Sequence, residues 1–334
     1  MAIFNANILM RELRKAAGLS QAQAAEGVCA RQTISAIERG ERKPDWYTFS
    51  NILRKYNVDP SRYYSDIASE DEMYIYNQMN VCNQLADSFD KEGFKREIDK
   101  MELDDRFKTG LGYQVLVGFK SVLYAYGPYE NVDLAMQACL EYLKFSRPQF
   151  NIDKISSYFL TESELRAVGR LATVYLSVGV NKANEIIDMD ALNMSLKLRY
   201  MVLENIEKNY SINMADSLRY IYIYTISNQS AILVSTLKQP EEAIVIIDKA
   251  LNLLKGLNAN VWLYFRILRN KVRALMLMGQ REEARAAFKR CLHFAYATDE
   301  DAYTDMKVKA LKLLWTETLN GESFEFDRIW ADNA

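Results

Sequence analysis

Residues that make turns are scarce in this sequence. Its 334 residues include 13 glycines and 5 prolines, less than half of the roughly 12% that these two residues reach together in average proteins. A large β protein needs turn residues about every dozen positions, and a doubly wound α/β fold needs glycine-containing crossovers. Both classes are therefore excluded, and the sequence predicts an all-α fold.

Histidine and clustered cysteine are also nearly missing. His293 is the only histidine, and the four cysteines, Cys29, Cys82, Cys139 and Cys291, lie far apart and form no CxxC pair. A structural zinc site needs clustered thiolate or imidazole ligands, and nucleophilic catalysis needs a histidine beside its nucleophile. We therefore expect no metal, no cofactor, no disulfide and no enzymatic activity.

Long apolar runs do not occur either. The chain has no stretch of about 18 uncharged apolar residues, and its first 17 residues contain Arg11, Glu12, Arg14 and Lys15 where a signal peptide would have an apolar core. The apolar fraction of 49% and the charged fraction of 26% are ordinary for a globular protein. We expect a cytoplasmic protein with no membrane partner.

The charge is distributed unevenly along the chain. The formal net charge is −2, but residues 1–62 hold ten Lys/Arg and six Asp/Glu and are therefore at +4, which leaves −6 for the remainder. A basic module attached to an acidic one suggests that the basic part binds a polyanion. The N-terminal segment is therefore the first place to look for a nucleic-acid site.

Local signals in this basic segment predict a series of short helices. Gly18 follows an amphipathic stretch where a left-handed cap is favoured, and residues 20–23 have the Ser-x-x-Gln spacing of a capping box. A further helix is expected over about residues 31–39, and Asp45 is expected to cap the next one. An aspartate and proline at residues 59–60 are typical of one more helix start. The pattern indicates five helices in about 60 residues.

Two of these helices, joined by a tight turn that contains Gly27, have the arrangement of a helix-turn-helix. Residues 11–60, "RELRKAAGLSQAQAAEGVCARQTISAIERGERKPDWYTFSNILRKYNVDP", resemble the Xre/Cro-like helix-turn-helix family. The "GLSQ" entry, the "TISAIERG" recognition helix and the "KP…VDP" exit carry the resemblance. The turn at residues 26–29 is one residue shorter than the common family form and is similar to that of peptide-responsive regulators of the Rgg and PlcR type.

The resemblance implies that the third helix enters the major groove of DNA. Gln21 is expected to bind backbone phosphate and to support the recognition helix. Arg31, Gln32 and Ser35 are expected to contact base edges, since Arg suits guanine and Gln suits adenine, each for about 1–3 kcal/mol of discrimination. Other residues of the segment are expected to contact phosphates, which position the protein without reading sequence: Thr33, Arg39, Arg42 and Lys43. The family also places an internal ion pair at Arg14 and Glu38.

Beyond this segment, amphipathic helical stretches follow one another with short breaks. Residues 66–73 are polar and acidic and are the expected linker between a head, residues 1–65, and a body, residues 74–334. The expected helices of the body lie at about 73–90, 92–102, 109–126, 130–146, 161–178, 190–208, 214–237, 241–255, 259–278, 281–296 and 302–319. Short breaks between helices favour antiparallel helical hairpins.

Internal repeats indicate how these hairpins stack. Residues 228–251 align with residues 269–292 at an offset of 41, and both fit the tetratricopeptide pattern of a small residue, a turn and an "EA" pair. Residues 169–183 and 126–143 supply two weaker copies. The sequence therefore predicts a right-handed α-solenoid of irregular tetratricopeptide-like repeats, whose inner wall is suited to an extended peptide or a partner helix.

In the tetratricopeptide pattern, the first helix of each pair lines the inner wall. Asn and Gln side chains can pair with a peptide backbone, and Arg suits carboxylates. The alternative for the arginines is a solvated helix face. The residues that fall at the wall positions, and that we expect to bind peptide, are Arg166, Arg170, Thr173, Thr225, Asn228, Gln229, Arg266, Arg269, Asn270 and Arg273.

Taken together, the Xre-type head and the tetratricopeptide-like body resemble the RRNPP family over essentially the full chain. The resemblance implies a homodimeric, quorum-sensing transcription regulator that binds a near-palindromic operator in double-stranded DNA and is switched by a short signalling peptide. Two alternatives stay open: a DNA-binding regulator without a peptide ligand, and a Rap-like adaptor that sequesters other proteins. An enzyme is the least favoured class, because no catalytic constellation is visible.

Overall fold

A computed structural model gives the fold of the chain and describes residues 6–56, 58–60, 70–88, 90–125, 127–209, 216–254 and 261–296. Within these ranges the regular structure is helical apart from one isolated bridge between Val180 and Ile186. The all-α prediction is therefore confirmed. The chain divides into two compact units, the first ending at Tyr222 and the second beginning at Ile223.

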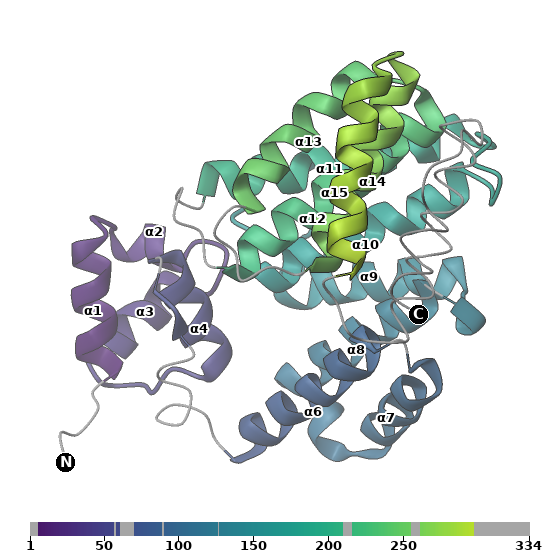
Figure 1. The fold of residues 1–334 in the computed structure, drawn as a ribbon. Helices are drawn as coiled ribbons and strands as arrows, with labels where there is room; N and C mark the ends of the chain where they lie inside the picture. Colours follow the sequence, from purple (N-terminus) through teal and green to yellow (C-terminus); the bar gives the residue numbers. More distant parts are fainter. Residues whose placement is uncertain are drawn as a thin grey trace. The chain divides into compact units, whose positions relative to one another are not determined.

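The first unit begins with four short helices, α1 (Ala6–Ala16), α2 (Gln21–Ala25), α3 (Arg31–Glu38) and α4 (Trp46–Lys55) (Figure 1). Their ends follow the predicted caps, because Gly18 has φ of +69° and the Ser20–Gln23 capping box forms. The Asp45 side chain accepts a hydrogen bond from the Thr48 amide. The expected helix start at residues 59–60 reaches the edge of the described residues.

A compact apolar core holds these four helices together. The core consists of fully buried side chains from all four of them, chiefly Met10, Ala24, Ile34, Ile37, Phe49, Ile52 and Leu53. Ile34 and Ile37 anchor the inner face of α3 in this core. Because helical side chains three and four positions apart share a face, these two isoleucines define the inner face of α3, and Ser35 and Ala36 between them are half-buried.

The rest of the first unit consists of helices that pack on their neighbours in sequence. They are α6 (Glu70–Asp87), α7 (Lys91–Leu103), α8 (Gly110–Ala125), α9 (Val132–Ser146), α10 (Glu162–Gly179) and α11 (Met189–Asn209). Contacts join α6 to α7, α8 to α9, α9 to α10 and α10 to α11. The predicted helices are thereby confirmed to within a few residues. Short 3-10 turns at 105–107, 127–129 and 152–157 are additions that the helical pattern did not predict.

The second unit contains the helices of the most regular predicted repeat. After the end of α12 (Asp216–Ile232), a π-helical turn over Leu233–Leu237 leads to α13 (Pro240–Leu254), α14 (Val261–Leu277) and α15 (Arg281–Tyr296). The starts of α13 and α15 are 41 residues apart, which is the predicted repeat offset. The equivalent alanines of the two "EA" pairs, Ala243 and Ala284, are both 0% exposed.

The burial of Ala284 makes a direct test of the repeat possible. We expect Ala284→Leu to destabilise the second unit by about 1–3 kcal/mol, because three added carbon atoms must enter a packed interface. Ala286 lies on the same helix and is exposed, so Ala286→Leu is the matched control and should change the free energy of unfolding by less than about 0.5 kcal/mol. Urea unfolding of the two variants measures both, and equal effects would contradict the repeat assignment.

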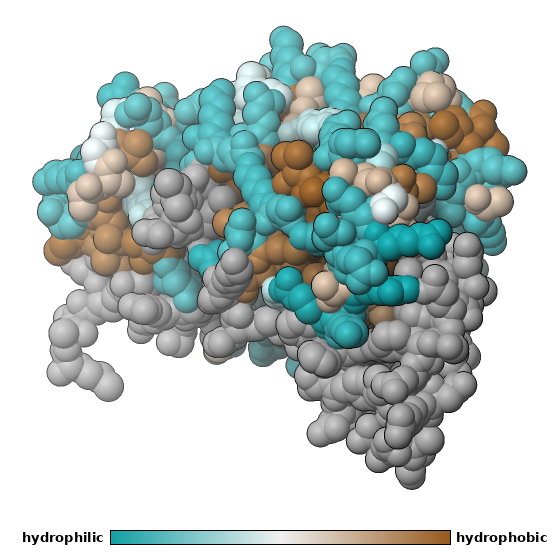
Figure 2. All heavy atoms as spheres, turned by 45° about the horizontal axis from the view of Figure 1, so that its top comes forward, coloured by the Kyte–Doolittle hydropathy of each residue, from teal (hydrophilic) through white to brown (hydrophobic). Residues whose placement is uncertain are grey.

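Hydrophilic residues dominate the face shown in Figure 2, with apolar residues emerging between them. None of the helices in the described ranges is long and apolar enough to cross a membrane. The predicted helix at 302–319 lies outside the described residues. The right-handed twist of the predicted solenoid and the boundaries 1–65, 66–73 and 74–334 stay predictions.

Candidate nucleic-acid interface

The outer face of α3 carries the residues that we expect to read DNA bases. Arg31 and Gln32, in the first turn, are exposed, while Ser35 is half-buried one turn later. The inner face is fixed by Ile34 and Ile37 in the core. The helix therefore presents a guanidinium and a carboxamide to solvent from an anchored backbone, as direct readout of base edges requires.

A buried ion pair holds α3 against α1. The Arg14 guanidinium donates from Nε to Glu38 Oε1 at 2.6 Å and from Nη2 to Oε2 at 3.0 Å. Gln21 Nε2, from the start of α2, donates to the same carboxylate at 2.9 Å. The internal pair implied by the family resemblance is thus present, and Gln21 supports α3 through Glu38. The expected contact of Gln21 with phosphate stays a prediction.

This network makes the stability of the head sensitive to acid. Burial alone would raise the pKa of Glu38, but the hydrogen bonds from Arg14 and Gln21 outweigh burial, so the pKa lies below its ordinary value of 4.5. A carboxylate whose pKa folding lowers stabilises the folded state above its ordinary pKa, and the contribution disappears as pH falls through the folded-state value. We therefore expect this contribution to decline below about pH 4.5.

Hydrogen exchange of head amides at pH values between 3 and 6, in the wild type and in Glu38→Gln, measures this dependence. The wild type should be the more stable of the two near pH 6, and the difference should shrink as the pH falls. A difference that stays constant over this range would show that Glu38 does not carry the effect.

Three predicted phosphate-contacting residues, Arg39, Arg42 and Lys43, follow the end of α3, and Thr33 lies in its first turn. Arg42 and Lys43 are exposed, and Thr33 is half-buried. Arg39, also exposed, donates from Nε and Nη2 to the two Glu41 carboxylate oxygens at 2.6 and 2.7 Å, and from Nη1 to Ser35 Oγ. In this structure the Arg39 guanidinium, which we expect to contact phosphate, is therefore paired with the Glu41 carboxylate.

We expect Glu41→Gln to strengthen DNA binding by about two- to fivefold at low salt, because the substitution releases Arg39 and removes a negative charge near the phosphates. Fluorescence anisotropy with duplex DNA at several salt concentrations measures the change. Glu12→Gln removes an exposed acid of α1 and serves as the control. An equal gain in both variants would attribute the effect to net charge alone.

The predicted peptide-binding residues of the first unit lie on α10. Arg166 is exposed, donates from Nη2 to Glu162 at 3.1 Å and lies 5.7 Å from the centroid of the Tyr220 ring. Arg170 is half-buried, 6.0 Å from the Tyr142 ring centroid. Thr173 is half-buried and accepts a hydrogen bond at 3.3 Å from Arg199. The arginines of this group are therefore reachable from solvent and are flanked by aromatic rings.

The predicted peptide-binding residues of the second unit divide into an accessible group and a buried group. Arg266 donates to Asn228 Oδ1 at 2.6 Å and lies 5.2 Å from the Tyr224 ring centroid. Asn228, Arg266, Arg269 and Arg273 are half-buried. By contrast, Thr225, Gln229 and Asn270 are 5%, 0% and 2% exposed.

The buried position of Asn270 has a packing explanation. Its Nδ2 donates to Ser227 O and Ser230 Oγ, both at 2.9 Å, and so joins α14 to α12. The accessible residues that suit a ligand in this unit are the arginines and Asn228, together with Tyr224, which the wall pattern did not include.

The cysteines of the described part of the chain are partly or fully buried. Cys29, Cys82, Cys139 and Cys291 are free thiols, and burial raises the pKa of Cys29 to about 11. A thiol with so high a pKa is a poor nucleophile at neutral pH. Among the described residues, no group of three or more His, Cys, Asp or Glu is placed to hold a metal ion.

Residues 10–62 match the helix-turn-helix family model. The match spans α2, the turn at Gly27 and the whole of α3. The head is therefore a helix-turn-helix domain, which is a DNA-binding module and not a catalytic one. None of the curated proteins matches the sequence.

The fold is similar to those of solved structures that include PlcR and ComR. PlcR of Bacillus thuringiensis, solved in complex with the peptide PapR7 and DNA, is 15% identical with a TM-score of 0.57, over 91% of this chain and 99% of that one. The apo form of ComR from S. thermophilus is 13% identical with a TM-score of 0.50, over 92% of this chain and 98% of that one. At these identities the likeness is one of fold. The chain is an all-helical protein with a helix-turn-helix domain, and its fold is the one found in PlcR and its structural relatives.

Proposed function

We propose that this protein is a cytoplasmic transcription regulator whose head binds operator DNA through α3 and whose body binds a short signalling peptide that switches DNA binding. The observation that carries the DNA-binding part is the exposed Arg31–Gln32 pair on an α3 that the core and the Arg14–Glu38 ion pair hold in place. PlcR, whose fold this chain shares, was solved with both a peptide and DNA.

The operator in this proposal is near-palindromic and the protein binds it as a homodimer. A single recognition helix reads only a few base pairs, so a head of this size gains affinity and specificity by binding two half-sites about 34–36 Å apart. A peptide that alters the spacing of the two heads would then change the affinity for the operator. The base-reading residues are Arg31, Gln32 and Ser35, with phosphate contacts from Gln21, Thr33, Arg39, Arg42 and Lys43.

The candidate peptide contacts in this proposal are arginines on α10 in the first unit and, separately, on α14 in the second unit. Arg166 and Arg170 form the first group, and Arg266, Arg269 and Arg273 the second. Guanidinium groups next to tyrosine rings suit a peptide that carries a carboxylate and apolar side chains. Asn228, held by Arg266, offers an amide that can pair with peptide backbone.

The peptide part is tested by mass spectrometry of small peptides that co-purify with the full-length protein, followed by calorimetric titration of the synthesised peptides. Arg266→Ala should weaken binding at least about tenfold, as the loss of a charge-assisted hydrogen bond does. Arg281→Ala, at an exposed arginine of α15, is the control and should bind as the wild type does. Recovery of no peptide would favour a regulator without a peptide ligand, and equal binding by both variants would show that the peptide does not contact Arg266.

A further inference from the structure

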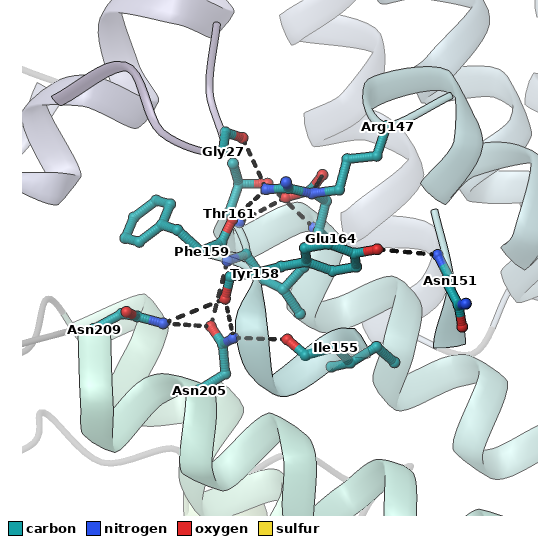
Figure 3. Close-up of polar contacts among 11 residues, drawn as sticks. Gly27, Arg147, Asn151, Ile155, Tyr158, Phe159, Thr161, Glu164, Asn205 and Asn209 are labelled. Atoms are coloured by element: carbon teal, nitrogen blue, oxygen red, sulfur yellow. Dashed lines mark hydrogen bonds and ion pairs between the residues drawn. The ribbon is translucent and has the colours of Figure 1, made fainter. Parts of the chain in front are cut away.

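A second feature of the first unit is a polar contact between the head and the body. Arg147 follows α9, and its guanidinium donates from Nη2 to Gly27 O at 3.0 Å, in the turn before α3 (Figure 3). The same guanidinium donates to the Phe159 carbonyl and, from Nε, to Glu164 at 3.1 Å. Arg147 therefore joins the helix-turn-helix turn to the N-terminal end of α10.

Helix α4 makes the other half of this contact. Lys55 Nζ lies 4.1 Å from the centroid of the Phe159 ring and donates to Glu26 O at 3.0 Å. Burial lowers the pKa of Lys55 to about 8, as expected for an ammonium group that the contact removes from water. Arg54 Nε lies 3.5 Å from Glu162 Oε2. The contact thus combines a cation–π pair, an ion pair and backbone hydrogen bonds.

The turn before α3 approaches Phe159 and Arg147 so closely that position 27 must be a glycine. Gly27 has φ of +76°, and a Cβ atom there would lie 2.3 Å from Phe159 O and 2.6 Å from Arg147 Nη2. No other residue at position 27 would let the turn lie this close to Phe159 and Arg147. Arg31 and Gln32 stay exposed in the same arrangement, so the contact leaves the base-reading face of α3 open.

Glu162 links this contact to the arginine-bearing face of α10. Its carboxylate faces Arg54 of the head at 3.5 Å and Arg166 of the body at 3.1 Å, and it accepts a hydrogen bond from Ser217 Oγ at 2.8 Å. Burial alone would raise the pKa of Glu162, but Arg166, Arg54 and Ser217 outweigh it and lower the pKa. Two cations from different parts of the chain therefore share one carboxylate.

We infer that the head docks through Gly27 and α4 on Arg147, Phe159 and the first turn of α10, with α3 left open, and that Arg166 sets the strength of this docking by competing with Arg54 for Glu162. Docking by itself requires no peptide. If a carboxylate ligand bound Arg166 in place of Glu162, Glu162 would pair with Arg54 alone and the docking would tighten. This consequence rests on the proposed function.

The docking is tested by electron–electron distance measurement on the full-length protein without DNA or peptide. Spin labels are attached through Glu12→Cys on the head and Lys154→Cys on the body, both exposed, in a protein whose native thiols are replaced by serine or alanine. The labelled protein is diluted with an excess of unlabelled protein, so that label pairs within one protomer dominate, and we expect one narrow distance distribution for the otherwise wild-type protein. A broad distribution there would overturn the proposal.

Gly27→Ala should broaden this distribution and lower the ratio of docked to undocked molecules at least tenfold. Gly18→Ala is the matched control, because Gly18 has a similar φ of +69° but nothing within 4 Å of its Cβ position. Both variants carry the same backbone strain, and only the first has the steric conflict. Equal distributions for the two variants would overturn the proposal.

The competition between Arg54 and Arg166 for Glu162 is tested by substituting these two arginines, which are half-buried and exposed, respectively. Arg54→Gln should lower the docked ratio about two- to fivefold, and Arg166→Gln should raise it by a similar factor. The effect of Arg54→Gln should be larger in the Arg166→Gln background, because Arg54 then has Glu162 to itself. Equal docked ratios in the single variants and the wild type would refute the competition. Because no peptide is used, these results do not depend on whether the proposed peptide binding is correct.

Discussion

Replacement of Arg31 and Gln32 together by alanine is expected to lower the affinity for the specific operator at least about 30-fold, with little change in binding to unrelated duplex DNA. Each side chain, exposed on α3, is suited to about 1–3 kcal/mol of base discrimination, and each 1.4 kcal/mol is a factor of ten in the dissociation constant. Anisotropy titrations of the two kinds of DNA at one salt concentration measure the loss.

Lys43→Ala is the informative comparison for this variant. Lys43 is exposed in the segment after α3, and loss of a phosphate contact should weaken binding to all sequences alike and reduce the salt slope by about one. If Arg31→Ala, Gln32→Ala and Lys43→Ala all weakened specific and nonspecific binding equally, α3 would not be the helix that reads bases.

Arg14→Leu is expected to destabilise the head by about 3 kcal/mol or more. Glu38 is 5% exposed, and removal of its guanidinium partner leaves a buried carboxylate without compensating charge. The destabilisation should appear as faster hydrogen exchange throughout α1, α2 and α3 in the full-length protein, and operator binding should weaken with it.

Two further variants isolate the cause. Lys15 is the neighbouring cation on α1 and forms an exposed pair with Glu12 at 3.4 Å, so Lys15→Leu should change head stability by less than about 1 kcal/mol. In Arg14→Leu/Glu38→Leu both charges are gone, and much of the lost stability should return. A double variant less stable than Arg14→Leu alone would contradict the role of the unpaired charge.

The helices of this protein could be predicted closely because their signals are local. Gly18, the Ser20–Gln23 capping box and Asp45 act within one helical turn of the ends that they define. The 41-residue repeat offset could also be predicted from the recurring "EA" pair. The structure agrees with it, because α13 and α15 bury the equivalent alanines. The π-helical turn at Leu233–Leu237 has no such signature in the amino-acid pattern.

The depth of individual side chains was less predictable. The wall positions follow from the tetratricopeptide pattern, which indicates the helix face on which a side chain lies and not what packs over it. Gln229 and Asn270 therefore shared a predicted role with Arg266, although the structure buries the first two. A polar residue that donates to another helix's backbone, as Asn270 does to Ser227, looks the same in sequence as one that faces a groove.

The docking contact between the head and the body could not be predicted from the sequence. Arg147 and Gly27 are 120 positions apart, and the hydrogen bond between them is visible only in three dimensions. The sequence pattern places Gly27 in the turn of the helix-turn-helix. Its positive φ explains that role, whereas the crowding by Phe159 and Arg147 gives it a second one.

The central claim, that the head reads an operator through α3, is tested most directly by selection of binding sites from random duplex DNA with the full-length protein. We predict enrichment of one near-palindromic sequence with two half-sites one helical turn, or a multiple of it, apart. The Arg31→Ala/Gln32→Ala protein should fail to enrich that sequence. Recovery of no preferred sequence by the wild type, or of the same sequence by the double variant, would contradict the account.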